Sequence, residues 1–263
     1  MDRHRGATVS EGGQPVNTHR RAATVVGIMF IIATVTAILG LLMYQPILAG
    51  PDFLVNGAGQ KDQVILGALM ELLLVCTAIG TAIGLFPVLR PYGERIALAH
   101  LCFRFLEAVV ITLGIVAVLS LLSVSQEFVA VAAPNASGLD ASAYHASGIL
   151  LRAVYKWTSM LGPLLFLGVN TFMYSYLLYK SKLVPRPLAV LGLGGAALVS
   201  GYGMLVLFGV AVQGAAPWVV LALPIAVYEM VLAGWLIVKG FNASASVFLP
   251  SMTTRTVAEP LSS

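Results

Sequence analysis

Six long runs of apolar residues, separated by shorter polar stretches, form the main pattern along this chain. They cover about 22–44, 64–89, 96–124, 149–179, 188–212 and 218–238. A helix crosses the hydrocarbon core of a bilayer in about 20 residues, and every run reaches that length. A membrane span must satisfy its own backbone hydrogen bonds, which favours helices for separate apolar runs. We therefore expect an all-α fold, a polytopic membrane protein with a six-transmembrane-helix bundle in residues 21–243.

The two ends of the chain differ from these runs. Residues 1–20 and 244–263 are polar and show no apolar periodicity. We expect a disordered cytoplasmic tail at 1–20 and a second cytoplasmic tail at 244–263, since neither has enough apolar surface to bury. The first apolar run is longer than the about 7–15 residues of a signal-peptide core, so we expect it to be retained as a helix.

Lysine and arginine predict the orientation, because they concentrate in the cytoplasmic loops of membrane proteins. With the N-terminus inside, the cytoplasmic set is Arg3, Arg5, Arg20, Arg21, Arg90, Arg95, Lys180, Lys182, Arg186, Lys239 and Arg255. Only Lys61 would then lie in a translocated loop, and the long segment 125–148 contains neither Lys nor Arg. We predict an N-in/C-in topology. No basic stripe is interleaved with aromatic residues, so we expect no nucleic-acid partner.

Small residues recur at helical spacing in the second and fifth runs. Gly80 and Gly84 are four residues apart, as are Gly192, Ala196 and Ser200. Such spacing lets two membrane helices approach closely. The stretch GLGGAA also fits a dinucleotide-binding pattern, but that pattern requires a preceding strand in a βαβ unit. Close helix packing is therefore the favoured interpretation.

The two cysteines, Cys76 and Cys102, lie in the middle of apolar runs. We interpret both as small buried hydrophobic residues. Neither has a second thiol or a histidine at ligand spacing, so we predict no metal site and no cofactor.

Ionisable residues inside the apolar runs are costly unless they face protein, water or one another. In the third run, Arg104 and Glu107 lie three residues apart on one helical face and are spaced to pair. At about 1.5 Å per residue, Arg104, Asn170 and Glu229 lie at similar depths from the inner boundary. We predict an inner tier that consists of His100, Arg104, Glu107, Asn170, Tyr174 and Glu229.

A second group of polar residues is predicted nearer the outer boundary. One face of the fourth run carries Arg152, Tyr155, Lys156, Ser159, Pro163, Phe166, Asn170 and Tyr174. Pro163 is expected to kink this helix, and Glu71 of the second run lies at the level of its outer half. We predict an outer tier that consists of Glu71, Arg152, Tyr155 and Lys156. Whether the two tiers form one continuous path is left open by the sequence.

Two interpretations of the buried charges remain. Paired charges can fix the register of neighbouring helices, which is a structural role. The same residues can instead line a ligand pocket or a proton path. We expect the lipid bilayer as surroundings and a small-molecule or lipid-like ligand at the charge cluster, with a structural or sensory subunit of a membrane complex as the alternative. Six helices without a visible inverted repeat are few for transport, and a homodimer is one way in which such a chain could build a path.

A second alternative is an intramembrane lipid hydrolase. Metal catalysis normally uses about three His or carboxylate ligands, and the apolar runs contain a single histidine, His100. A serine triad would need His100 beside a serine, yet the serines of the runs lie at other depths. We therefore assign no catalytic residues.

Four stretches resemble a known family. They are VVGIMFIIATVTAILGLLMYQPIL, ALMELLLV, RFLEAVVI and YEMVLAGWLIVKGFN. They are similar to the bacterial integral-membrane family catalogued as domain of unknown function 4386. The resemblance covers about 22–243 and includes Glu71, Glu107 and Glu229. It implies a multi-pass protein of the bacterial inner membrane and brings no established activity.

Overall fold

All regular elements in the described part of the chain are helices. The computed structural model describes residues 14–131, 138–213 and 216–242. The long helices are α1 (Gln14–Met43), α4 (Lys61–Leu89), α5 (Glu94–Val131), α6 (Gly138–Met160), α7 (Leu167–Ser181), α8 (Arg186–Leu207) and α9 (Ala216–Val238). The short elements are α2 (Gln45–Leu48), α3 (Phe53–Gly59), a 3-10 turn (Arg90–Tyr92) and a π-helical segment (Leu161–Phe166). The all-α prediction is confirmed.

Six stretches are long and apolar enough to cross a bilayer. They are Arg20–Met43, Lys61–Tyr92, Glu94–Val131, Ala141–Ser181, Arg186–Leu207 and Val220–Val238. By helix length and hydropathy this is a multi-pass membrane protein. The tail expected at 244–263 lies outside the described residues, as does most of the tail expected at 1–20. The first helix begins at Gln14, so the last residues of that tail are helical.

The segment expected to be a long loop, 125–148, is largely helical. Helix α5 continues to Val131, and α6 already begins at Gly138. The stretch SQEFVAV contains neither Gly nor Pro to end the helix, and Phe128 packs on α6. Its ring centroid lies 6.1 Å from that of Tyr144 and 5.3 Å from that of His145. A segment without Lys or Arg is therefore not, for that reason, an irregular loop.

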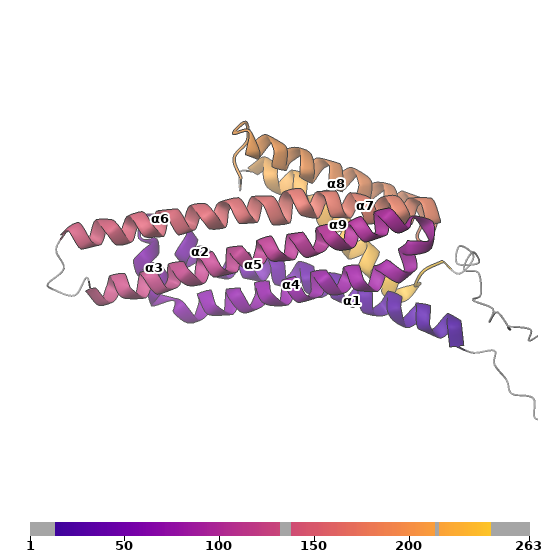
Figure 1. The fold of residues 1–263 in the computed structure, drawn as a ribbon, viewed down its shortest axis with the longest axis horizontal. Coiled ribbons are helices and arrows are strands. Elements are labelled where there is room, and N and C mark those ends of the chain that lie inside the picture. The colour runs from indigo at the N-terminus through magenta and orange to yellow at the C-terminus, as the bar shows by residue number, and fades with distance from the viewer. Residues whose placement is uncertain (1–13, 132–137, 214–215, 243–263) are drawn as a thin grey trace, which may run out of the picture.

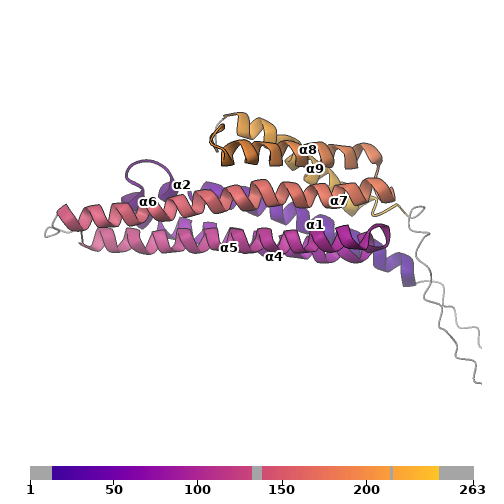
Figure 2. The ribbon, with the colours of Figure 1, turned by 45° about the horizontal axis from the view of Figure 1, so that its top comes forward.

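The helices form a bundle in which neighbours pack over long stretches. Helix α1 packs between α4 and α9, while α5 contacts α4, α6 and α7. Helices α6 and α7 continue one another through the π-helical segment and run the length of α5 (Figure 1). Helix α8 packs on α7 and on α9, and Figure 2 shows this α8–α9 pair lying along one half of the bundle. Helix α6 therefore has α5 as its main partner.

Buried apolar residues form two larger clusters towards the two ends of the bundle. One cluster contains Phe30, Leu85, Leu177 and Leu232, and the other contains Ile47, Leu54, Val118 and Leu121. The charged residues Glu71, Arg104, Glu107 and Glu229 belong to neither cluster, whereas Tyr174 belongs to the first and Tyr155 to the second. The apolar ends therefore hold the bundle together on either side of a polar middle section.

Glycines allow the close helix contacts that the sequence predicted. A Cβ atom added at Gly80 would lie 2.7 Å from Sδ of Met29, and one at Gly84 would meet Val26. At Gly192 an added Cβ would lie 2.6 Å from Cε1 of Tyr228. These contacts confirm close packing of α4 on α1 and of α8 on α9.

The interpretation of the cysteines as buried residues was wrong. Both Cys76 and Cys102 are free and exposed on the outside of the bundle. The outer surface of a membrane helix is as apolar as its core, because it faces lipid. An apolar neighbourhood in the sequence therefore does not distinguish the two faces.

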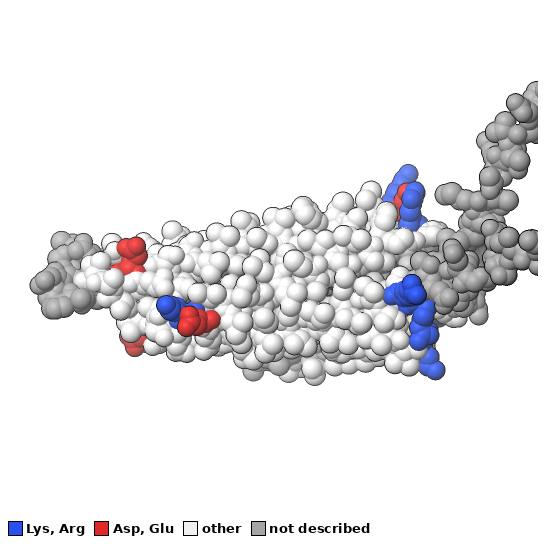
Figure 3. Space-filling model, turned by 90° about the horizontal axis from the view of Figure 1, so that it is seen from below, with Lys and Arg blue, Asp and Glu red and all other residues white. Residues whose placement is uncertain are grey.

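On the face drawn in Figure 3, charged side chains lie near the two ends of the bundle and not in its middle. Most of the Lys and Arg side chains gather at the end where α1 begins, beside an acidic group, while acidic residues lie towards the other end beside a basic group. At the basic end, Arg20 donates to the carbonyl oxygen of Val238 over 2.9 Å. Lys180 donates to the carbonyl oxygen of Tyr92 over 2.9 Å. The uncharged band between the two ends is typical of a surface that faces hydrocarbon.

Candidate functional site

A cavity of about 720 Å³ lies in the polar middle section of the bundle. Its walls come from α1, α4, α5, α6 and α9, with the π-helical segment between α6 and α7. Residues from both predicted tiers line it: Glu71, Arg104, Glu107, Arg152, Tyr155, Lys156 and Glu229. Apolar side chains of α1 and α4, such as Ile38 and Leu74, make up much of the remaining wall. The cavity is therefore amphipathic.

The inner end of the cavity is formed by a hydrogen-bonded ion pair. Nη1 of Arg104 donates to both carboxylate oxygens of Glu107, over 3.2 and 3.1 Å. Nδ2 of Asn170, on α7, donates to Oε2 of Glu107 over 2.6 Å. The Arg104 and Glu107 side chains are only 5% and 4% exposed. Helical spacing of three residues on α5 makes this pairing possible, and α7 completes it from across the bundle.

Glu229 of α9 faces the same ion pair from another wall. Its Oε2 accepts a hydrogen bond from the Thr34 hydroxyl over 3.4 Å. It interacts electrostatically with Arg104. Within the described residues, however, no cation lies within the 4.0 Å of a salt bridge to Glu229. Arg104 is thus paired with Glu107 and shared with Glu229 only over a longer distance.

His100 and Tyr174 lie next to the ion pair but do not line the cavity. Both are fully buried, and their ring centroids are 5.3 Å apart. The Tyr174 ring also stacks on that of Tyr228, at 6.0 Å, and Ser175 donates to the Tyr228 hydroxyl. His100 interacts electrostatically with Asn170, although neither ring nitrogen has a hydrogen-bond partner in the described chain. These residues pack behind the inner wall.

The predicted outer tier is only partly assembled. The Tyr155 hydroxyl donates to Oε1 of Glu71 over 3.3 Å, whereas Oε2 of Glu71 is buried and has no partner among the described residues. Arg152 donates instead to the carbonyl oxygens of Leu48 and Gly50. Its guanidinium also lies 4.5 Å from the centre of a ring, that of Phe53. Arg152 therefore ties the segment between α2 and α3 to α6 and makes no ion pair with Glu71.

The π-helical segment explains how both tiers reach one cavity. Pro163 lies inside it and has no backbone N–H to donate, so a regular α-helical turn is interrupted there. A π-helical turn accommodates an extra residue, and such turns are frequent at functional sites. The kink expected at Pro163 is thus realised as a widened turn. It joins the cavity-lining face of α6 to the buried Asn170 and Tyr174 of α7.

Five further polar residues that line the cavity were missed by sequence reasoning: Thr34, Gln45, Thr81, Thr158 and Gln213. Thr34 and Gln45 line it from α1 and α2, and Gln213 lines it from the turn before α9. Thr34 and Gln45 are about three helical turns apart, so their common face is visible in the sequence. Gln213 donates to the Ser159 hydroxyl over 3.0 Å. Because Gln213 lies in a turn, no helical spacing in the sequence could have indicated that it lines the cavity.

No group of three or more His, Cys, Asp or Glu residues is placed to hold a metal ion in the part of the chain that the structure describes. His100 is enclosed by Tyr174 and Asn170 behind the inner wall, while His145 packs against Phe53 and Phe128. The arrangement can hold a polar group by hydrogen bonds and charge. It presents no nucleophile hydrogen-bonded to His100 among the described residues.

The fold and the cavity define a class: a multi-pass α-helical membrane protein with charged residues facing an internal cavity. Residues 25–240 match the family described as domain of unknown function (DUF4386). This match covers most of the chain, so the protein belongs to that family. Neither the curated proteins nor the solved structures include a match to the chain.

Proposed function

We propose that this protein binds or passes a small amphipathic, lipid-like ligand in the cavity between α1, α5, α6 and α9. The main support is that charged residues from four helices face one cavity of about 720 Å³, within the range of about 300–1,000 Å³ typical of ligand sites. The ligand's polar part lies against Glu71 and Glu229, the two carboxyl groups that no cation pairs within the described chain. Its apolar part lies along the aliphatic side chains of α1.

The charges of the cavity favour a ligand that donates hydrogen bonds, such as an amine. Glu107 is satisfied by Arg104 and Asn170, but Glu71 and Glu229 have no cation within 4.0 Å in the described chain. A buried carboxylate without a counter-charge is strongly unfavourable. A protonated amine at either of these carboxylates would supply that charge.

The residues that line the cavity on α1 and α6 favour entry of the ligand from the bilayer. Ile38 and Leu41 line the cavity on α1 and are 55% and 50% exposed, so they also contribute to the outer surface. Lys156 and Ser159 line the cavity from α6, which has its main contact with α5 and not with α1. An apolar chain can therefore pass between α1 and α6 while its polar group stays inside.

A structural role is the second candidate, and one observation favours it for part of the site. The charges of Arg104 and Glu107 are paired within the protein, and Asn170 joins this pair from α7, although Arg104 Nε and Asn170 Oδ1 have no hydrogen-bond partner among the described residues. Such a group fixes helix register without any ligand. The same account does not extend to Glu71 and Glu229, which is why we place the ligand's polar group against these two residues.

Binding of a dansyl-labelled long-chain amine tests the proposal, with a carboxylic acid of equal chain length as the comparison probe. In lipid nanodiscs, Ala37→Trp should fill the cavity and weaken binding of the amine by more than about tenfold. Glu229→Gln should weaken binding of the amine by a similar factor. It should not weaken binding of the carboxylic acid, because only the amine loses a charge partner.

Val35→Trp is the matched control for the cavity-filling variant. Val35 lies on α1, two residues from Ala37, is 46% exposed and does not line the cavity. Equal loss of binding in the two tryptophan variants would contradict a cavity site. An identical effect of Glu229→Gln on amine and acid would show that Glu229 acts on the fold and not on the ligand.

We also propose that both termini lie in the cytoplasm of a bacterial cell, with α2 and α3 on the outer side. In a Cys76→Ala/Cys102→Ala background, a membrane-impermeant maleimide should label Lys61→Cys in intact cells. Lys239→Cys should be labelled only after the cells are permeabilised, since the Lys and Arg cluster marks the inner side. The reverse pattern would mean the opposite orientation.

A further inference from the structure

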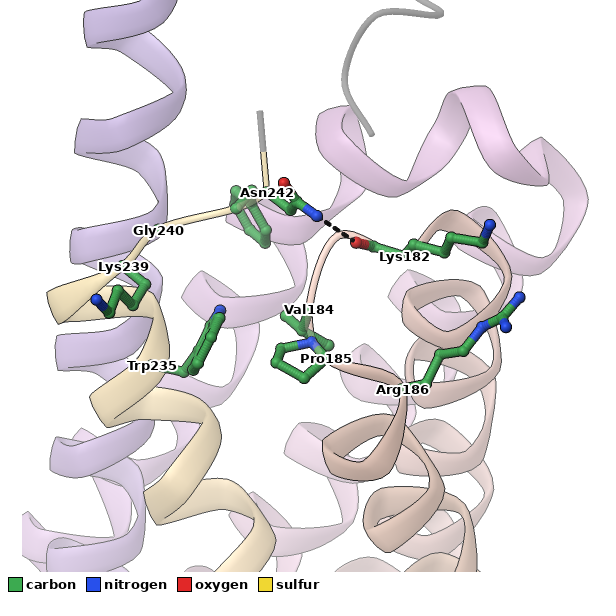
Figure 4. A pocket seen from close by; sticks show the side chains of 9 residues that line it. Lys182, Val184, Pro185, Arg186, Trp235, Lys239, Gly240 and Asn242 are labelled. Carbon is green, nitrogen blue, oxygen red and sulfur yellow. Dashed lines mark hydrogen bonds between the residues drawn. The ribbon is translucent and has the colours of Figure 1, made fainter. Parts of the chain in front are cut away.

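A second hollow lies at the basic end of the bundle, remote from the polar cavity. It has a volume of about 610 Å³ and is bounded by the turn between α7 and α8 and by the end of α9. Lys182, Arg186 and Lys239 line it together with Trp235. Figure 4 shows Lys182 and Arg186 on one rim and Lys239 on the opposite rim, with Trp235 between them and the charged ends of all three side chains turned outward, so that these flexible side chains would turn inward to reach a ligand. We call this hollow the basic recess.

The basic recess lies at the depth of lipid headgroups. Three of the apolar stretches long enough to cross a bilayer end or begin here, at Ser181, Arg186 and Val238. The turn from Lys182 to Pro185 and the residues after Val238 therefore lie just beyond the hydrocarbon core. Tryptophan and basic residues are both enriched at this boundary.

The charge of the recess is positive on every side. Its three cationic side chains are exposed, and none of its described lining residues is acidic. Helix α8 begins here with Pro185 as N-cap and has no side-chain cap, so the positive end of its dipole adds to the field. The carbonyl oxygens at the end of α9 are covered by Arg20, which donates to Val238 over 2.9 Å.

An unsatisfied donor inside the recess points to a ligand with acceptor oxygens. Nε1 of Trp235 is buried and has no hydrogen-bond partner among the described residues. A buried tryptophan N–H normally has one. The opposite wall is held by Asn242, whose backbone N–H donates to the carbonyl oxygen of Leu183 over 2.9 Å. The recess is thus shaped by the protein's own backbone, and the Trp235 N–H is left without an acceptor among the described residues.

We propose that the basic recess binds the phosphate-bearing headgroup of an anionic phospholipid from the adjoining leaflet. The phosphate oxygens would accept from the Trp235 indole and lie between Lys239 and the Lys182–Arg186 rim, and the acyl chains would run along α8 and α9. Basic pockets between membrane helices recognise such headgroups by charge. Because the recess lies away from the polar cavity, this site is independent of the amphipathic ligand proposed above.

The test measures lipid enrichment around the full-length protein in nanodiscs of equal parts phosphatidylglycerol and phosphatidylcholine. Native mass spectrometry then reports the phosphatidylglycerol that stays bound. A triple variant changes Lys182, Arg186 and Lys239 to Gln. It should retain less than about one tenth of the phosphatidylglycerol that the parent protein retains, since each cation near the surface contributes to the attraction. Trp235→Phe, which removes only the N–H group, should give a smaller loss of several-fold.

The matched control changes Arg21, Arg95 and Lys180 to Gln, which removes the same charge from the same end of the bundle without touching the recess lining. It should retain phosphatidylglycerol. An equal loss in both triple variants would overturn the proposal and indicate general surface charge. Displacement of phosphatidylglycerol by millimolar inorganic phosphate would also overturn it, because the recess would then be a site for free phosphate.

Discussion

Replacing Arg104 by Gln is expected to destabilise the bundle by about 3–5 kcal/mol, because it leaves the Glu107 carboxylate buried without its cation. Glu107 is 3% exposed, and the variant keeps only the Asn170 hydrogen bond to it. Removing one partner of a buried pair costs more than the pair itself contributes. The effect is measured by heating the detergent-solubilised protein and recording, at each temperature, how much of the monodisperse chromatographic peak remains.

Two further variants make this result specific. The Arg104→Gln/Glu107→Gln double variant should recover most of the lost stability, because two neutral amides can bond to each other and to Asn170. Arg90→Gln removes a surface pair with Glu94, whose side chains are 58% and 61% exposed, and should cost less than about 1 kcal/mol. A double variant as unstable as Arg104→Gln alone would show that Arg104 acts through another partner.

Gly192→Leu is expected to destabilise the bundle by about 1–3 kcal/mol or more through overpacking. An added Cβ would lie 2.5 Å from Oγ of Ser175 and 2.6 Å from Cε1 of Tyr228. The larger side chain would also separate the Ser175 hydroxyl from the Tyr228 hydroxyl, which accepts its hydrogen bond over 2.8 Å. The same unfolding measurement applies.

Gly194→Leu on the same helix separates packing from helix propensity. A Cβ at Gly194 meets nothing within 4 Å, and replacing a helical glycine by leucine is favourable by itself. This variant should therefore be as stable as the parent protein or slightly more stable. If Gly192→Leu matched it, α8 would not be packed against Tyr228 as described.

The sequence predicted the membrane class and the six spanning helices, because length and hydropathy are properties of each segment taken alone. The proximity of Arg104 and Glu107 followed from helical geometry in the same way. The contact between Glu107 and Asn170 needed an additional assumption, that equal depth places residues of two helices side by side. Here that assumption matched the structure.

The positions of other residues depend on contacts between segments, which the depth of a residue in the membrane and the helical period do not predict. Arg152 was grouped with Glu71 by depth, but the segment between α2 and α3 folds back and offers it the carbonyl oxygens of Leu48 and Gly50. Cys76 and Cys102 lie on the outer face, which is as apolar as the interior. Gln213 reaches the cavity from a turn. Each of these positions is decided by how neighbouring segments pack.

The π-helical segment around Pro163 also keeps the two halves of the fourth span in phase with one another. Each residue of an α-helix advances the side-chain direction by about 100°, but a π-helical turn takes up one extra residue within about the same rotation. Deleting one residue between Leu161 and Phe166, so that the wide turn becomes α-helical, should therefore leave Tyr155 at Glu71 and Asn170 at Glu107. A deletion between Tyr155 and Met160 would instead rotate the preceding part of α6 by about 100° and take Tyr155 away from Glu71. The wide turn thus lets the fourth span contain an additional residue without misaligning the two tiers.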